Sequence, residues 1–259
     1  MVIRRQTGFT LIEIAIVLLI VIVLLGYSVA MFPMQQELKQ YRAAEAQMDT
    51  IIEELIAFAQ VNGRLPCPDT SGNVNATGAG TLDGQEDTDT EASGDISCKS
   101  FYGFLPARSL GMNGKYNSTG QLVDPWGAPF RYAISNTDTG DGDIDLVTAN
   151  NIRDEGMTNV TPDLTLCDDS TTIGNQLTCV DAGGSNVITQ VAAIVVSLGK
   201  SNLAANASNI ETENLDNLHV GTTDKLFISS VRREDYDDVV RWVSTNLLFS
   251  RMIAADQLP

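Results

Sequence analysis

The sequence is poor in the residues on which many enzymes and nucleic-acid-binding proteins rely. It contains a single histidine, His219, which excludes mechanisms that need two imidazoles. Bases are also scarce: 16 Lys and Arg stand against 33 Asp and Glu, so the net charge is −17 and the pI is near 4.2. A surface this acidic repels phosphate groups. We therefore expect no nucleic-acid partner, and cations are the more natural small ligands.

Motifs for catalysis and nucleotide binding are missing as well. The "GKS" at Gly199–Ser201 resembles the end of a phosphate-binding loop, but Ile194 stands where the first glycine of that loop would be required. No Gly-x-Ser-x-Gly occurs, and His219 would have to serve a serine nucleophile alone. The remaining acids are scattered, so we expect that the protein is not an enzyme.

The four cysteines contain no Cys-x-x-Cys spacing, which argues against a zinc ribbon or a thioredoxin-type site. An even number in a chain with a membrane-crossing signal favours two disulfides in an oxidising compartment. Three pairings are possible. We choose the sequential pairs, Cys67–Cys98 and Cys167–Cys179, because each pair brackets one polar, loop-like stretch.

One long apolar segment is present near the N-terminus. Nineteen residues from Ile14 to Phe32 carry no charge, and the run from Phe9 would reach roughly 36 Å as a helix, enough to cross a bilayer. Glu13 in this run costs about 2–3 kcal/mol if it is buried centrally, and less near a helix end. It either lies at the membrane surface in contact with water or has a partner, and physical reasoning alone leaves both alternatives open.

The orientation of this segment is indicated mainly by the cysteines. Arg4 and Arg5 precede it, but Lys39 and Arg42 follow it, so the distribution of positive charge is a weak indicator. The expected disulfides place residues 33–259 outside the cytoplasm. An ordinary cleaved signal peptide is disfavoured because "YSVA" before Met31 is a poor cleavage site.

Beyond Pro33 the pattern predicts a helix followed by strands. Apolar residues recur every three or four positions up to a stop at Asn62-Gly63, so we expect one helix over residues 9–61, interrupted or kinked at Pro33. The acidic stretch Asp83–Asp95 is expected to be a solvated, mobile loop. Strands are predicted at Phe130–Ile134, Asp143–Thr148, Ile188–Leu198, Leu226–Val231 and Val239–Ser244. A helix at Thr245–Asp256, capped by Thr245 or Asn246, completes an α+β fold.

The run "GFTLIEIAIVLLIVIVLL" resembles the prepilin N-terminus that type IV pilins and type II secretion pseudopilins share. The resemblance implies that prepilin peptidase cuts after Gly8 and that Phe9 becomes an N-methylated N-terminus. It also implies that Glu13 pairs with the N-terminus of a neighbouring subunit. "DPWGAPFRYAIS" at Asp124–Ser135 resembles the major pseudopilin, in which this turn leads into an antiparallel sheet and a later loop binds calcium.

Two sets of acids are candidates for calcium, with solvated acids as the alternative at each. Glu211, Glu213 and Asp216 follow "VSLGKSN" at about the place where the family binds calcium. Asp141, Asp143 and Asp145 alternate along the chain, although Leu146 and Ile152 replace the Gly and Glu that an EF-hand loop would need.

These features predict a prepilin leader (1–8), a transmembrane helix (9–32), an amphipathic helix (33–63) and a periplasmic or extracellular globular domain (64–259). We expect a pilin-like fold: a long N-terminal helix packed on an antiparallel sheet with disulfide-bounded insertions. The predicted function is a structural subunit, of the minor type, of a type IV pilus or type II secretion pseudopilus. It would stand in the bacterial inner membrane before it enters the fibre.

The expected partners are other pilin or pseudopilin subunits, prepilin peptidase, and an inner-membrane assembly platform with a cytoplasmic ATPase. A major pilin is the first alternative. A single-pass anchored periplasmic binding or sensor protein that never polymerises is the second, although an anchor alone gains nothing from Glu13.

Overall fold

The computed structural model describes residues 8, 10–70, 82–90, 94–138, 144–168, 170–173, 176–179, 187–201, 209–215, 225–233 and 236–259. For residues 25–34, 170–173, 176–178 and 209 only the backbone is described. The chain divides into two units, residues 1–42 and 43–259, and each is considered by itself.

The first unit contains the N-terminal part of helix α1, which runs from Leu11 to Asn62. The helix starts with the backbone N–H groups of Glu13 and Ile14, which both donate to the Thr10 carbonyl. It continues through residue 33, so of the two expectations at Pro33, an interruption or a kink, the interruption is wrong. A proline removes one helical hydrogen bond, and neighbouring turns can carry the helix past it. Among the described helices, none is both long and apolar enough to cross a membrane.

The part of α1 in the second unit is an amphipathic core helix. Its fully buried side chains follow the predicted spacing of three and four residues: Ala44, Met48, Ile51, Leu55 and Ala59. Phe58, which continues the same spacing, is only half-buried and lies under the Arg64 guanidinium, 5.3 Å from the ring centroid. The helix ends where predicted, because Gly63 adopts a φ of 66° that favours glycine.

The second unit is built on a six-stranded sheet. The strand order is β3 (Tyr102–Phe104), β4 (Arg131–Ile134), β8 (Val187–Ser197), β5 (Leu164–Cys167) and β9 (Leu226–Ile228), and β10 (Val239–Ser244) also pairs with β8. The pairings are antiparallel except for β5 and β9, which are parallel. The α+β class is confirmed. The expectation of a purely antiparallel sheet is wrong, because the long connection between β5 and β9 allows a parallel crossover.

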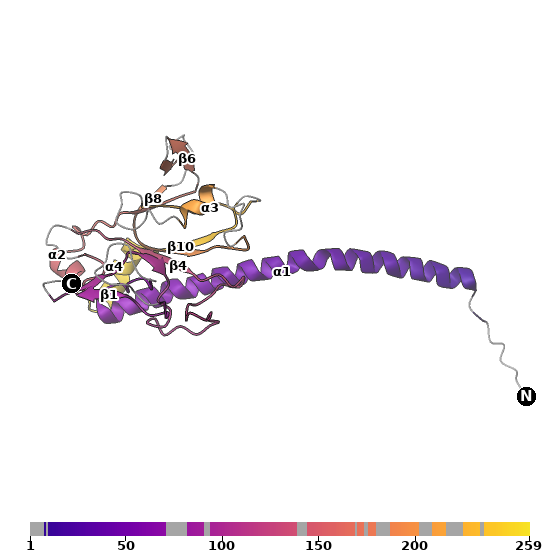
Figure 1. The fold of residues 1–259 in the computed structure, drawn as a ribbon, viewed down its shortest axis with the longest axis horizontal. Helices are drawn as coiled ribbons and strands as arrows, with labels where there is room; N and C mark the ends of the chain where they lie inside the picture. Colours follow the sequence, from indigo (N-terminus) through magenta and orange to yellow (C-terminus); the bar gives the residue numbers. More distant parts are fainter. Residues whose placement is uncertain are drawn as a thin grey trace, which may run out of the picture. The chain divides into compact units, whose positions relative to one another are not determined.

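The two faces of this sheet pack against different parts of the chain. Successive side chains of β10 point to opposite faces and show these two environments. Val240 and half-buried Trp242 pack into an apolar cluster with Ile194 and Phe227. Arg241, between them, turns instead to α1, where its guanidinium lies 3.5 Å from Glu45 and 3.1 Å from Asp49. The C-terminal turns of α1 therefore cover one face of the sheet (Figure 1).

Shorter elements complete the second unit. They are the hairpins β1 (Thr88–Thr90) with β2 (Ile96–Cys98) and β6 (Ser170–Ile173) with β7 (Gln176–Cys179), and the helices α2 (Asn151–Glu155), α3 (Asn209–Glu213) and α4 (Thr245–Ala254). α4 packs against α1: the Gln60 amide donates to the Arg251 carbonyl at 3.0 Å.

Three local predictions are wrong. The segment predicted as a strand at Asp143–Thr148 forms turns from residue 145 onward, and four successive residues (145–148) are buried instead of alternate ones. β9 ends at Ile228, so the strand predicted to Val231 is shorter. The N-cap of α4 is Ser244, not Thr245 or Asn246, because Thr245 is already helical and its hydroxyl donates to the Gln190 carbonyl.

Candidate functional site

The N-terminal part of α1 carries the residues predicted for processing and assembly. Gly8 is exposed, and Glu13 is exposed in the first turn of the helix. Phe9 lies outside the described residues. The positive end of a helix favours a carboxylate in its first turn, and this placement sets Glu13 close to the segment where a new N-terminus would begin.

The helix surface that follows Glu13 is apolar on every side. All the large apolar side chains described from Leu11 to Leu24 are exposed, with exposed fractions between 41% at Val21 and 88% at Leu11. Glu13 is the only charged residue in this stretch. A helix that is hydrophobic all round is normally buried. This surface therefore requires an apolar partner, which lipid or neighbouring helices can provide.

A second candidate is a group of acids at the start of β10. One carboxylate oxygen from each of Glu211, Asp237 and Asp238 lies within 4.8 Å of the others. Asp237 accepts hydrogen bonds from the backbone N–H of Lys200 and of Ser201 and holds that turn in place. Glu211 accepts from the Asp237 N–H at 2.9 Å. The group thus links α3, the turn after β8 and the start of β10.

Asp238 is a buried member of this acidic group, and its carboxyl has a raised pKa. Burial raises the pKa of its carboxyl to about 8, against a hydrogen bond from the Asn214 amide that lowers it, and Glu211 and Asp237 raise it further. The same Asn214 amide donates to the Ile228 carbonyl. A cation bound here would stabilise the ionised carboxylates and lower this pKa.

Of the residues predicted as calcium ligands, one lies in this acidic group. Glu211 belongs to it, whereas Glu213 is buried outside it, and Asp216 falls outside the described residues. Of the other predicted set, Asp141 and Asp143 also fall outside them, and Asp145 is fully buried.

Asp237 and Asp238 are partners of Glu211 that the sequence did not predict. In the sequence these two residues are visible as the acidic pair that opens "DDVVRWVS". Their proximity to Glu211 of α3 is not visible there, because the tertiary fold creates it. Carboxylate oxygens are suitable ligands for calcium. However, all three carboxylates already accept hydrogen bonds, so a bound cation would share their oxygens with these donors.

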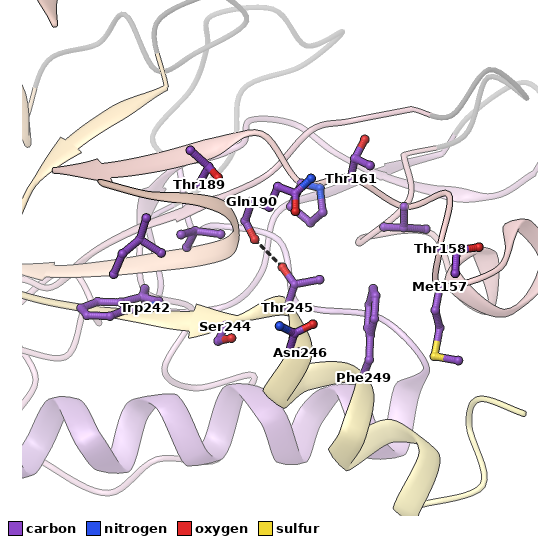
Figure 2. Close-up of a pocket in the computed structure, with 14 residues that line it drawn as sticks. Met157, Thr158, Thr161, Thr189, Gln190, Trp242, Ser244, Thr245, Asn246 and Phe249 are labelled. Atoms are coloured by element: carbon purple, nitrogen blue, oxygen red, sulfur yellow. Dashed lines mark hydrogen bonds between the residues drawn. The ribbon is translucent and has the colours of Figure 1, made fainter. Parts of the chain in front are cut away.

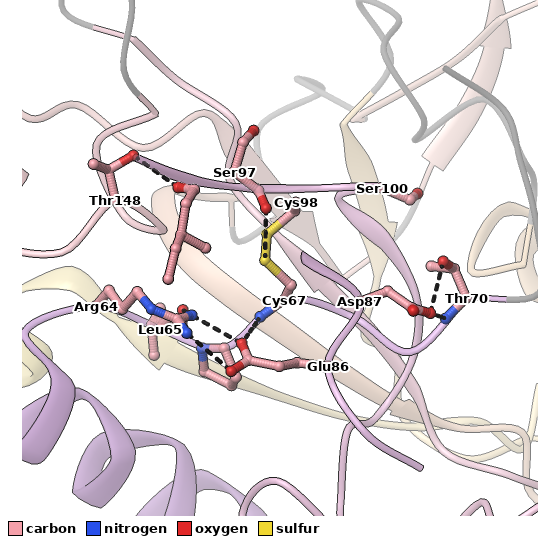
Figure 3. The surroundings of a disulfide bond; sticks show 12 residues. Arg64, Leu65, Cys67, Thr70, Glu86, Asp87, Ser97, Cys98, Ser100 and Thr148 are labelled. Carbon is pink, nitrogen blue, oxygen red and sulfur yellow. Dashed lines mark hydrogen bonds and ion pairs between the residues drawn. A yellow bond between two sulfur atoms is a disulfide. The ribbon is translucent and has the colours of Figure 1, made fainter. Parts of the chain in front are cut away.

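The two disulfides are the pairs expected from the sequence: Cys67–Cys98, with Cα atoms 5.2 Å apart, and Cys167–Cys179, at 5.7 Å. Around the first, Arg64 donates two hydrogen bonds to Glu86, at 2.8 and 2.9 Å (Figure 3). Asp87 accepts from the backbone and hydroxyl of Thr70. The prediction that Asp83–Asp95 is a solvated loop is therefore wrong for Glu86 and Asp87, because residues from outside this stretch bind both carboxylates.

The Asp-Pro-Trp-Gly turn is organised by the Asp124 carboxylate. One oxygen accepts from the backbone N–H groups of residues 126, 127 and 128, and the other accepts from the Ser197 hydroxyl at 2.7 Å. Gly127 has a φ of 98°, which glycine adopts without strain. Burial raises the pKa of Asp124 while these hydrogen bonds oppose the shift. Asp124 thus ties the turn to the end of β8.

A cavity of about 320 Å³ lies where β8, β10 and the start of α4 meet. Trp242 and Phe249 supply apolar surface, and Gln190 and Asn246 supply amides (Figure 2). The residues that line it carry no ionisable side chain. It can accommodate a neutral molecule but offers no general acid or base.

The comparisons with known proteins identify the N-terminal segment. Residues 3–28 match the family model of the prokaryotic N-terminal methylation motif. This motif is the prepilin-type signature of type IV pilins and pseudopilins, so the resemblance at Gly8–Leu25 is confirmed. It marks a structural subunit type rather than an enzyme family, and it supports a pilin-like or pseudopilin substrate of prepilin peptidase. Neither the curated proteins nor the solved structures gave a match.

Proposed function

We propose that this protein is a structural subunit of a type IV pilus or a type II secretion pseudopilus. Prepilin peptidase cuts after Gly8, and Phe9 becomes the N-methylated terminus. The observation that carries the proposal is the exposed apolar surface of Leu11–Leu24, which contains Glu13 as its only charge and lies within the matched motif. An apolar helix surface of this kind is suited first to lipid and then to neighbouring helices in a fibre.

Glu13 acts as the docking residue in this proposal. Its carboxylate pairs with the freed ammonium group at the N-terminus of a neighbouring subunit. A buried charge left without its partner costs several kcal/mol, so the pair favours one axial register of neighbouring helices over all others. A residue that served only to anchor the chain in lipid would gain nothing from this charge.

Features of the globular unit favour the proposal of a minor subunit with a pilin-like fold. The C-terminal turns of α1 pack on one face of the sheet, as the fold class requires. Two disulfides and the additional β6–β7 hairpin enlarge the domain, and bulk of this kind would crowd a lattice in which it were repeated at every position. The inner-membrane platform and its cytoplasmic ATPase extract the helix into the fibre. Calcium, bound through Glu211 and Asp238, would neutralise the acidic group at the start of β10.

The assembly proposal is tested by separate substitutions of its two exposed residues. Glu13→Ala is expected to be processed and to reach the membrane but to enter fibres poorly. Gly8→Trp is expected to block processing, because the peptidase must fit the residue before the cut. Glu37→Ala, which removes an acid from the same helix outside the matched motif, is the control and should assemble normally. Normal processing and normal fibres in both test variants would refute the proposal.

A further inference from the structure

Three polar side chains from the ends of three strands meet in the second unit. Asn136 follows β4, Asp163 precedes β5 and Lys225 precedes β9. The Lys225 ammonium nitrogen contacts both the Asn136 side-chain carbonyl oxygen and the Asp163 Oδ2 atom. Asn136 and Lys225 are 89 positions apart in the chain, so the sheet and not the local sequence brings them together.

The backbone around these residues is held by the strands. The N–H of Thr165 donates to the Lys225 carbonyl at 2.9 Å, and the N–H of Ser135 donates to the Ala192 carbonyl at 3.0 Å. The amine, the amide and the carboxylate are therefore attached to rigid elements. Such placement keeps reacting groups together at high effective concentration.

Asp163 is oriented by a neighbouring hydroxyl. The fully buried Ser135 donates to Asp163 Oδ1 at 2.8 Å and accepts from the Asp163 backbone N–H at 3.1 Å. Because Oδ1 is occupied, Oδ2 is the oxygen that faces the amine of Lys225. A carboxylate fixed in this way can accept a proton from the amine and return it to a leaving group.

The site also lies partly out of water. The Lys225 side chain is 18% exposed and that of Asp163 is 29% exposed. Burial lowers the pKa of the Lys225 amine, because the charged form loses hydration. A lysine amine becomes nucleophilic when it is deprotonated, and removal from water favours that form.

From this geometry we propose that Lys225 and Asn136 form an intramolecular amide cross-link, with Asp163 as the proton-transfer group. Asp163 takes a proton from the Lys225 ammonium, and the amine lone pair then attacks the Asn136 Cγ atom. The carbonyl electrons move to oxygen and return as the bond from Cγ to Nδ2 breaks. Asp163 passes its proton to the departing nitrogen and then accepts the second proton of the attacking nitrogen, which it hands to the ammonia. The products are one new amide bond and one ammonium ion, so protons and charge balance, and no oxidant or further reactant is needed.

A simple ion pair would explain only part of this arrangement. Lys225 and Asp163 suffice for an ion pair, and such partly exposed pairs contribute about 1 kcal/mol or less. The amide carbonyl directed at the same amine and the hydroxyl that orients the carboxylate add the acyl group and the fixed base that an amide-forming reaction requires. The bond would join the end of β4 to the start of β9 and, unlike the disulfides, would resist reduction.

The experiment is peptide mapping by mass spectrometry of the full chain, purified in detergent, reduced and denatured. A branched peptide that joins the Asn136 and Lys225 segments, lighter than their sum by one ammonia molecule, is expected. Peptide mapping is needed because Asn113-Gly114 can lose ammonia by itself when it forms a cyclic imide. Lys225→Arg keeps the charge but should yield only separate peptides, and Lys115→Arg, at an exposed lysine, should retain the branched peptide.

Asp163→Asn tests the role of the proton-transfer group and should leave the two peptides separate while the chain remains folded by near-ultraviolet circular dichroism. Separate Asn136 and Lys225 peptides in the unaltered protein would overturn the proposal. A branched peptide lighter by one water molecule and joined at Asp163 would also overturn it, since Asp163 would then be the acyl group rather than the base.

Discussion

Replacing Asp69 by Asn should stabilise the protein near neutral pH. Asp69 is fully buried, and its Oδ2 atom accepts from the Gly84 N–H at 2.9 Å, whereas Oδ1 has no hydrogen-bond partner among the described residues. Burial raises the pKa of Asp69 to about 6; the Gly84 hydrogen bond opposes the shift, and Asp87 and Asp83 add to it. The carboxyl side chain is therefore easiest to bury while it is protonated.

The sign and size of the effect follow from this pKa. The folded protein binds the Asp69 proton more tightly than the unfolded chain does, so the contribution of Asp69 to stability is most favourable below pH 3.8 and falls as the pH rises to about 6. The difference between the two pKa values corresponds to about 3 kcal/mol. We expect about 2 kcal/mol in practice, because an asparagine carbonyl can still accept from Gly84 but its amide gains no certain partner.

The assay is urea unfolding of the full chain in mild detergent, followed by tryptophan fluorescence from pH 4 to pH 8. Asp69→Asn should be more stable than the unaltered protein at pH 7 and should show a smaller decline between pH 4 and pH 6, because the decline caused by Asp238 remains. Asp154→Asn, at an exposed acid, is the control and should leave that decline unchanged. The same dependence on pH in Asp69→Asn and in the unaltered protein would contradict the raised pKa of Asp69.

Three further predictions concern other contacts of the second unit. Replacing both Cys67 and Cys98 by Ser opens a loop with a sequence separation of 31 and should reduce the free energy of unfolding by about 4 kcal/mol, whereas an unchanged urea midpoint would contradict this. Arg241→Ala should cost about 1 kcal/mol or less, because its two acidic partners on α1 are exposed; a loss of several kcal/mol would show that these ion pairs are not screened. Calcium should raise the thermal midpoint relative to a chelator, and Asp238→Asn should reduce that rise. The calcium site is refuted if the midpoint of the unaltered protein does not change.

Most of the regular elements could be predicted because they carry local patterns. The strands at β4, β8 and β10 and the core face of α1 follow periods of two or of three to four residues, and the structure confirms them. The turn at Asp145–Thr148 could not be recognised in this way, because four successive buried residues give the same apolar signal as a strand. The order of Glu86 and Asp87 could not be predicted, because their partners, Arg64 and Thr70, lie outside the acidic stretch.

The candidate sites also differ in whether a local sequence pattern marks them. Glu13 could be identified because the motif is contiguous, and a single charge in an apolar run is visible in the sequence. The group of Glu211 with Asp237 and Asp238, and the contact of Lys225 with Asn136, depend on sheet pairings between distant segments. No local spacing encodes such long-range contacts, so only the tertiary structure reveals them.

The most direct test of the central claim is the identity of the mature N-terminus. The protein should be isolated from the membrane fraction of cells that contain a prepilin peptidase, and its N-terminal peptide should be measured by mass spectrometry. We expect this peptide to begin at Phe9 and to carry one methyl group on its amine. An N-terminus that remains at Met1, or one that begins beyond the apolar run near Met31, would contradict this expectation.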